Sequence, residues 1–236
     1  NYSSIINGFN NQIIGNYARF NLIGTGANNI INSYSHTTIL GGISNVVRAT
    51  NGAFFSIFQG SGNTIQPVGG SQYFMTIING KNQYALNKYT IIGNGISNSA
   101  TSIYATVING NTNLAQATAS SVFNGNNNRA LGNYSGIFNG RFNFISSSHG
   151  IVLNGFINSA ITGTYSTIVN GSGNTASGIL SSVINGVVNV ASGVHSLIGA
   201  GILNIASPRY TLILNGSNNS ATTSHHATVI TGIRNR

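Results

Sequence analysis

The chain of 236 residues contains no aspartate, no glutamate, no cysteine and no tryptophan, and only two prolines. Without cysteine there is no disulfide framework, no thiolate chemistry and no zinc–thiolate site. Without carboxylates there is no group for general acid–base catalysis, for orienting a histidine, or for binding Ca²⁺ or Mg²⁺. We therefore expect that the protein is not an enzyme and that it holds no metal and no cofactor.

The absence of acidic residues needs its own explanation, because they normally make up about half of a charged fraction of about 25%. One explanation is biological: an extracellular protein that lives in acid gains little from carboxylates that are protonated there. The other is an assignment artefact, since Asp and Asn, like Glu and Gln, look alike in a density map. The sequence leaves both explanations open.

The formal net charge of +9 comes from nine scattered Lys and Arg side chains. They do not form the stripe or patch of a nucleic-acid footprint, so we interpret them as solvated charges that keep the protein soluble. Asn, Gly or Ser interrupts every apolar run, so we expect no membrane span. Residue 1 is Asn and no signal peptide opens the chain, so we expect a processed chain or a piece of a longer one.

What the chain does have is a signature, Gly-x-x-Asn, that returns fifteen times, with Gln83 replacing the Asn once. The signature glycines are Gly8, Gly26, Gly42, Gly60, Gly80, Gly95, Gly110, Gly125, Gly140, Gly155, Gly171, Gly186, Gly201, Gly216 and Gly232. The first spacings are 18, 16, 18 and 20 residues, and all later ones are 15 or 16. A short fixed period means one structural unit stacked many times.

Two columns of the repeat predict an interior. The residue three before each signature Gly, from Ile5 to Val229, is always β-branched and aliphatic, which suits a buried pleated surface. The residue five after it is mostly Ala. An Asn directly precedes ten signature glycines, and we call it the flanking Asn. Asn-Gly is a strong turn signal because both residues tolerate positive φ. The flanking residues are Asn7, Asn79, Asn94, Asn109, Asn124, Asn139, Asn154, Asn170, Asn185 and Asn215.

These patterns predict an all-β fold: a parallel β-solenoid, or β-roll, of about fifteen coils of roughly 15 residues, with strands about 4.8 Å apart. We expect one rod-like domain over residues 1–236. Residues 1–80 should form irregular coils with loop insertions, including Pro67 and the neighbouring Gly69 and Gly70, and residues 81–236 regular coils of 15 or 16 residues.

The signature Asn is predicted to turn inward and to bond to its equivalent one coil away, because stacked β-structure supports Asn ladders. The alternative is a surface turn residue. The predicted ladder consists of Asn98, Asn113, Asn128, Asn143, Asn158, Asn174, Asn189, Asn204 and Asn219.

Large apolar residues occupy the place two before the signature Gly, and we call them the apolar row. Successive strand residues face opposite sides, so this row should point outward if the column before it is buried. Such an exposed row calls for another copy of the chain under cyclic symmetry; the alternative is a broad coil that holds both columns inside. The predicted interface residues are Ile6, Leu40, Phe58, Ile78, Ile108, Phe123, Phe138, Leu153, Val169, Ile184, Leu214 and Ile230.

Aromatic rings recur six residues before the signature Gly, and we call them the ring row. Four of the five His belong to it, so we interpret them as structural rings in offset stacks rather than as a proton switch. The ring row consists of Tyr2, Phe20, His36, Phe54, Phe74, Tyr89, Tyr104, Tyr134, His149, Tyr165, His195, Tyr210 and His226.

Units such as Tyr165-Ser-Thr-Ile-Val-Asn-Gly-Ser-Gly-Asn-Thr-Ala-Ser-Gly178 resemble the head repeats of trimeric autotransporter adhesins of the Yersinia type, and similar repeats of surface and viral fibre proteins. The resemblance spans nearly the whole chain. It implies a left-handed parallel β-roll, a homotrimer, and adhesion to host or matrix surfaces. The chain departs from the family in its longer period, its nearly fixed Asn and its lack of acids.

We therefore expect a structural subunit of an extracellular or cell-surface fibre, filament or adhesin, with copies of itself as partners and with a host, matrix or cell surface as a further one. A viral or phage tail fibre, on a virion surface, is the first alternative. A monomeric ice- or sugar-binding solenoid is the second, because Ser or Thr often stands four before the signature Gly; Leu22, Ile91 and Leu197 are among the residues that interrupt this column.

Overall fold

The computed structural model describes residues 2–15, 19–33, 36–49, 54–68 and 73–235. The fold is all-β, a parallel β-solenoid of about 14 turns of ~15 residues, and these ranges contain no helix. The predicted fold class is confirmed at this level. Two compact units, Asn1–Ala119 and Ser120–Arg236, are described in turn. That residues 1–236 form one domain stays a prediction.

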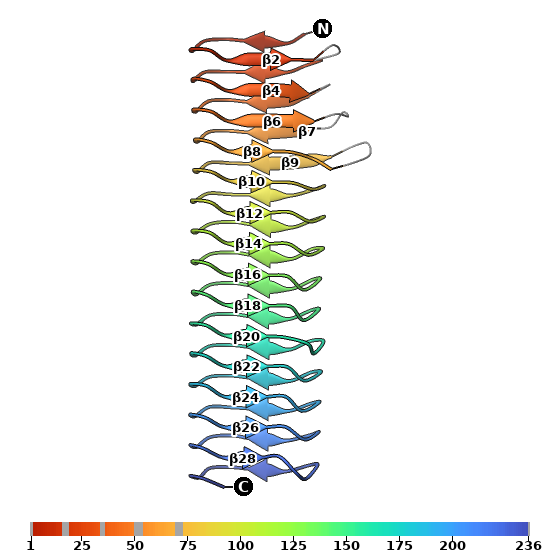
Figure 1. Cartoon of the computed structure of the whole chain (residues 1–236), viewed down its shortest axis with the longest axis vertical. Coiled ribbons are helices and arrows are strands. Elements are labelled where there is room, and N and C mark those ends of the chain that lie inside the picture. Colours follow the sequence, from red (N-terminus) through yellow and green to blue (C-terminus); the bar gives the residue numbers. More distant parts are fainter. Residues whose placement is uncertain (1, 16–18, 34–35, 50–53, 69–72, 236) are drawn as a thin grey trace. The chain divides into compact units, whose positions relative to one another are not determined.

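In the first unit, successive strands add alternately to two parallel sheets, so that each coil contributes one strand to each sheet (Figure 1). One sheet contains the odd-numbered strands β1 (Ser4–Ile5), β3 (Leu22–Ile23), β5 (Thr37–Ile39), β7 (Phe54–Ile57), β9 (Phe74–Ile77), β11 (Ile91–Ile92) and β13 (Thr106–Val107). The other contains the even-numbered strands β2 (Gln12–Ile14), β4 (Ile30–Ser33), β6 (Val46–Ala49), β8 (Thr64–Ile65), β10 (Tyr84–Ala85), β12 (Ser99–Ala100) and β14 (Leu114–Ala115).

The second unit repeats this arrangement. Its odd-numbered strands are β15 (Ser121–Val122), β17 (Gly136–Ile137), β19 (Ile151–Val152), β21 (Thr167–Ile168), β23 (Ser182–Val183), β25 (Leu197–Ile198), β27 (Leu212–Ile213) and β29 (Thr228–Val229). Its even-numbered strands are β16 (Arg129–Ala130), β18 (Phe144–Ile145), β20 (Ser159–Ala160), β22 (Thr175–Ala176), β24 (Val190–Ala191), β26 (Ile205–Ala206) and β28 (Ser220–Ala221).

The register places equal repeat positions side by side. Ile91 pairs with both Thr76 and Thr106, one coil away on either side. Ser56 pairs with Thr76 although 20 residues separate them, so the extra residues of the early coils leave the ladder undisturbed. Several of these extra residues, including the predicted loop residues Gly69 and Gly70, lie outside the described part of the chain.

A thin core lies between the two sheets of each unit. The aliphatic residue three before the signature Gly is fully buried in most coils, as at Ile137, and so is the residue five after it, as at Ala130. The signature Asn is also buried, together with a small polar residue five before the Gly, as at Ser135 and Ser166. In most coils of the second unit the core therefore contains one large aliphatic side chain, one small one and a set of polar groups, whereas Ile31, Phe55 and Met75 add bulk in the first unit.

Left-handed backbone conformations turn the corners of each coil. They occur in the ring row, as at Tyr165 (φ 61°), and two residues after the signature Gly, as at Ile157 (φ 54°). In the Asn-Gly pair only the Gly has positive φ, for example 120° at Gly155. A Cβ there would lie 2.3 Å from the carbonyl oxygen of Gly171, so the coils stack too closely at this point for any side chain.

Candidate self-association surface

The apolar row lies on the outside of both units, directly after each odd-numbered strand. Its members in the first unit are 42–71% exposed, from Ile108 to Ile6. In the second unit Phe123 and Phe138 are 42% and 44% exposed, and Val169 is half-buried. A broad coil with this row inside is therefore not the arrangement that the chain adopts.

The row is contoured as well as apolar. In the first unit, the side chains of Leu40, Phe58 and Ile78 line a shallow groove of about 540 Å³ together with Thr25 and Gln59. In the second unit, the rings of Phe123 and Phe138 stack in parallel at 4.7 Å between centroids, with 7° between their planes. A partner that bound here would thus contact an apolar groove in the first unit and stacked aromatic rings in the second.

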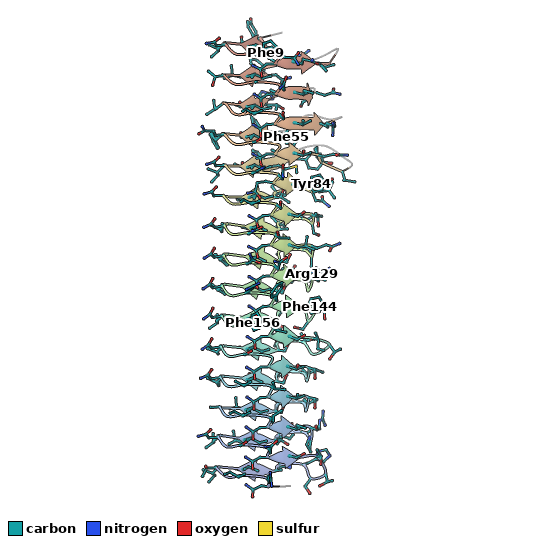
Figure 2. All side chains as sticks on the ribbon, turned by 60° about the vertical axis from the view of Figure 1, so that its left-hand side comes forward. Phe9, Phe55, Tyr84, Arg129, Phe144 and Phe156 are labelled. Carbon is teal, nitrogen blue, oxygen red and sulfur yellow. The ribbon has the colours of Figure 1, made fainter. Side chains whose placement is uncertain are left out.

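No Lys or Arg occupies the outward positions of the odd-numbered sheet, which lie two, four and six residues before each signature Gly. The cations lie elsewhere. Arg48 is on β6 and Arg129 on β16, in the even-numbered sheets, and Arg141 lies next to a signature Gly. The Arg129 guanidinium is 6.0 Å from the centre of the Phe144 ring, on the next even-numbered strand (Figure 2). The apolar row therefore lies on a face whose outward positions carry no Lys or Arg, although Arg19, Lys88 and Arg209 directly precede ring-row residues.

Hydrogen bonds link the signature Asn side chains of neighbouring coils. At Asn158 the Oδ1 accepts the backbone N–H of Asn174 at 3.0 Å, and the Nδ2 donates to the carbonyl oxygens of Gly171 at 3.0 Å and Asn154 at 3.2 Å. The same pattern recurs at Asn143, Asn174, Asn189 and Asn204. Each side-chain amide thus ties its own turn to the following coil.

The ring row forms stacks within each unit, and Leu180 divides the row of the second unit into two stacks. In the first unit they run from Tyr2 to Tyr104 with centroid distances of 4.8–6.1 Å. In the second unit His149 lies between Tyr134 and Tyr165, at 5.1 and 4.6 Å. Because neighbouring rings cover one another's faces, the row presents mainly ring edges to solvent.

A second exposed apolar patch in the second unit was not identified from the sequence. It lies one and two residues after the signature Gly, and we call it the corner patch. Its exposed fractions range from 42% to 51%. The corner patch consists of Phe156, Ile157, Val187, Val188, Ile202 and Leu203. Ser172 and Gly173 interrupt it, so it does not form a continuous apolar column.

The described residues contain no group of three or more His, Cys, Asp or Glu that could hold a metal ion. Within the same ranges, no helix has the length and apolar character that a membrane crossing requires. No protein-family model matches the chain, and no match is found among curated proteins.

Proposed function

We propose that the protein is a structural subunit of an extracellular or cell-surface fibre, filament or adhesin, and that its copies associate through the apolar row. The observation that carries this proposal is the combination of exposed large apolar side chains and absent charge on one face of each unit. Contiguous apolar surface of this kind marks interaction sites in soluble proteins.

Electrostatics favour the same face for contact between identical chains. Every copy carries a formal charge of +9 with no carboxylate to offset it, so copies repel one another wherever their cations approach. Contact through the apolar row keeps Arg48 and Arg129, which lie on the even-numbered strands, away from the interface. A cyclic homotrimer, which the adhesin resemblance implies, satisfies this requirement because each chain presents the same face to the symmetry axis.

The alternatives fit these surfaces less well. In a sugar-binding solenoid we would expect open aromatic faces, whereas the ring row stacks its faces together. In an ice-binding solenoid we would expect a flat Ser/Thr face, yet Ile151, Leu197 and Leu212 interrupt the outward column, and the Ser/Thr residues one place earlier are buried. A viral or phage tail fibre would use the same self-association and remains the second candidate.

Analytical ultracentrifugation of matched variants tests the proposal. The double variant Phe138→Ser/Leu153→Ser weakens the apolar row, and Phe156→Ser removes a Phe of similar exposure, 42%, from the corner patch. We expect the natural protein and Phe156→Ser to sediment as trimers or larger assemblies, and the double variant to sediment as a smaller species with unchanged circular dichroism. The apolar row is not the interface if the natural protein is a monomer, or if Phe156→Ser dissociates the assembly and the double variant does not.

A further inference from the structure

The ten flanking Asn residues form a second chemical feature, distinct from the apolar row beside them. All ten are exposed, whereas the signature Asn three residues after each Gly is buried in most coils. The two kinds of Asn thus alternate along the chain in two opposite environments. Their chemistry should differ accordingly.

In several of the Asn-Gly pairs, the N–H of the Gly is directed at the side chain of the preceding Asn. Gly80, Gly95 and Gly216 donate this N–H to the Oδ1 of the preceding Asn at 2.7 Å. The ladder between coils uses the neighbouring amides instead: Asn94 donates to the carbonyl of Ile108 and Ile96 donates to that of Gly110. Since Cγ is bonded to that Oδ1, the Gly nitrogen already lies beside the side-chain carbon.

We propose that the flanking Asn residues are sites of spontaneous deamidation, with water as the only co-reactant. The Gly nitrogen attacks Cγ, a C–N bond forms, and the bond from Cγ to Nδ2 breaks, so that ammonia leaves with the proton of the Gly N–H. Water then opens the resulting cyclic imide at either carbonyl and leaves an aspartate or an isoaspartate. No electrons are transferred to or from another group.

The tight stacking makes the Gly obligatory, and this exposes the Asn to attack. A Cβ at Gly95 would lie 2.0 Å from the carbonyl oxygen of Gly110, so no side chain can be placed there to shield the nitrogen. The Asn itself is replaceable, because Thr25 occupies the same position in an early coil. The sequence therefore retains a reactive pair at a position where the fold requires only its second member.

The signature Asn is protected by the same ladder. Asn98 is 1% exposed, its Oδ1 accepts the N–H of Asn113 at 3.0 Å, and its Nδ2 donates to two carbonyl oxygens. The nitrogen that would attack it belongs to Ser99 and donates to the carbonyl of Asn113 at 2.8 Å. These hydrogen bonds must open before Asn98 can react.

Deamidation would have a large electrostatic effect in this chain, because Asp and Glu are otherwise absent. Each event replaces a neutral amide by a carboxylate next to the apolar row and lowers the net charge by one. Conversion of all ten flanking Asn residues would take the formal charge from +9 to about −1. The long-range repulsion between copies would fall with the net charge, while the new carboxylates of each copy would lie beside its apolar row.

The test is a time course on the folded protein at mildly alkaline pH, in heavy-oxygen water, read by intact mass and by mapping of the proteolytic peptide that contains both Asn94 and Asn98. We expect one heavy oxygen to enter at Asn94 and the chain to focus at successively lower pH. Conversion at Asn98 should be at least about tenfold slower, since buried hydrogen bonds must open first. Asn94→Thr, which copies Thr25, should lose only its own event.

Two results would overturn the proposal. The first is an Asn94 that stays an amide while a synthetic peptide of the same sequence converts. The second is equal conversion at Asn94 and Asn98. Neither result bears on self-association through the apolar row, which ultracentrifugation tests separately.

Discussion

Gln83 is the one signature position without Asn, and the substitution Gln83→Asn tests the amide ladder directly. The Gln83 Oε1 accepts the N–H of Asn98 at 2.9 Å, but its buried Nε2 has no hydrogen-bond partner in the protein. One coil later, the Nδ2 of Asn98 donates to the carbonyl oxygens of Asn94 at 3.1 Å and Gly110 at 3.0 Å. We expect the shorter amide at position 83 to reach the equivalent carbonyls of the preceding turn and the next coil.

The expected increase in the free energy of unfolding is the difference between two opposing contributions. Providing partners for a buried amide recovers about 1–3 kcal/mol, and the loss of one buried methylene removes about 0.8 kcal/mol. The free energy of unfolding should therefore rise by about 0.2–2.2 kcal/mol. For a chain of this size that corresponds to an increase in melting temperature of up to about 9 °C.

Thermal and urea denaturation followed by circular dichroism measure this gain. The reverse substitution, Asn158→Gln, is the matched control, because it introduces the longer amide into a coil where Asn158 makes all three side-chain hydrogen bonds. It should destabilise the protein by a similar amount. If Gln83→Asn leaves the unfolding free energy unchanged or lowers it while Asn158→Gln has no effect, the side-chain amides do not stabilise the stacking and the reasoning fails.

Three further predictions concern the backbone and the missing acids. Gly155→Ala should destabilise the protein by more than about 3 kcal/mol in urea denaturation, because its Cβ would meet the Gly171 carbonyl. The control Gly136→Ala should change stability by less than about 0.5 kcal/mol, because its Cβ has only an ordinary contact at 3.6 Å. Ile157→Asn should raise the melting temperature, since Asn tolerates the left-handed conformation (φ 54°) that costs a β-branched residue about 1–2 kcal/mol. Acid unfolding normally follows protonation of paired carboxylates, and this chain has no carboxylate side chain. The free energy of unfolding from urea denaturation should therefore differ by less than about 1 kcal/mol between about pH 5 and pH 2. A sharp acid transition would contradict this.

The repeat made the solenoid predictable, because its two inward columns could be read from residue type alone. Aliphatic residues such as Ile137 and small ones such as Ala130 are fully buried where the pattern placed them. The corners were not predictable in the same way. Tyr165 and Ile157 take left-handed backbone conformations that their local preferences oppose. Backbone hydrogen bonds to the neighbouring coil offset the energetic cost of these conformations.

Of the two exposed apolar surfaces, one could be predicted from the sequence and the other could not. The outward direction of the apolar row followed from alternation along a strand, and residues such as Phe138 are exposed accordingly. The corner patch at Phe156 and Val187 could not be found this way, because the coil bends between the signature Gly and the next strand and simple alternation ends there. Strand alternation therefore predicts the exposure of the apolar row but not that of the corner patch.

The hydrogen bonds of the amide ladder also bear on why the sequence contains no Asp or Glu. The Nδ2 of Asn158 donates to two carbonyl oxygens while its Oδ1 accepts an N–H, and a carboxylate accepts only. An Asp there would face two carbonyl oxygens without a proton to share, next to equivalent charges one coil away. The hydrogen bonds at the signature positions therefore favour an amide over a carboxylate. The fold sets no such preference at exposed positions such as the flanking Asn, so the absence of acids there must come from the surroundings of the protein or from acids that were written as amides. Intact mass of freshly made protein, before any flanking Asn has converted, separates these two origins.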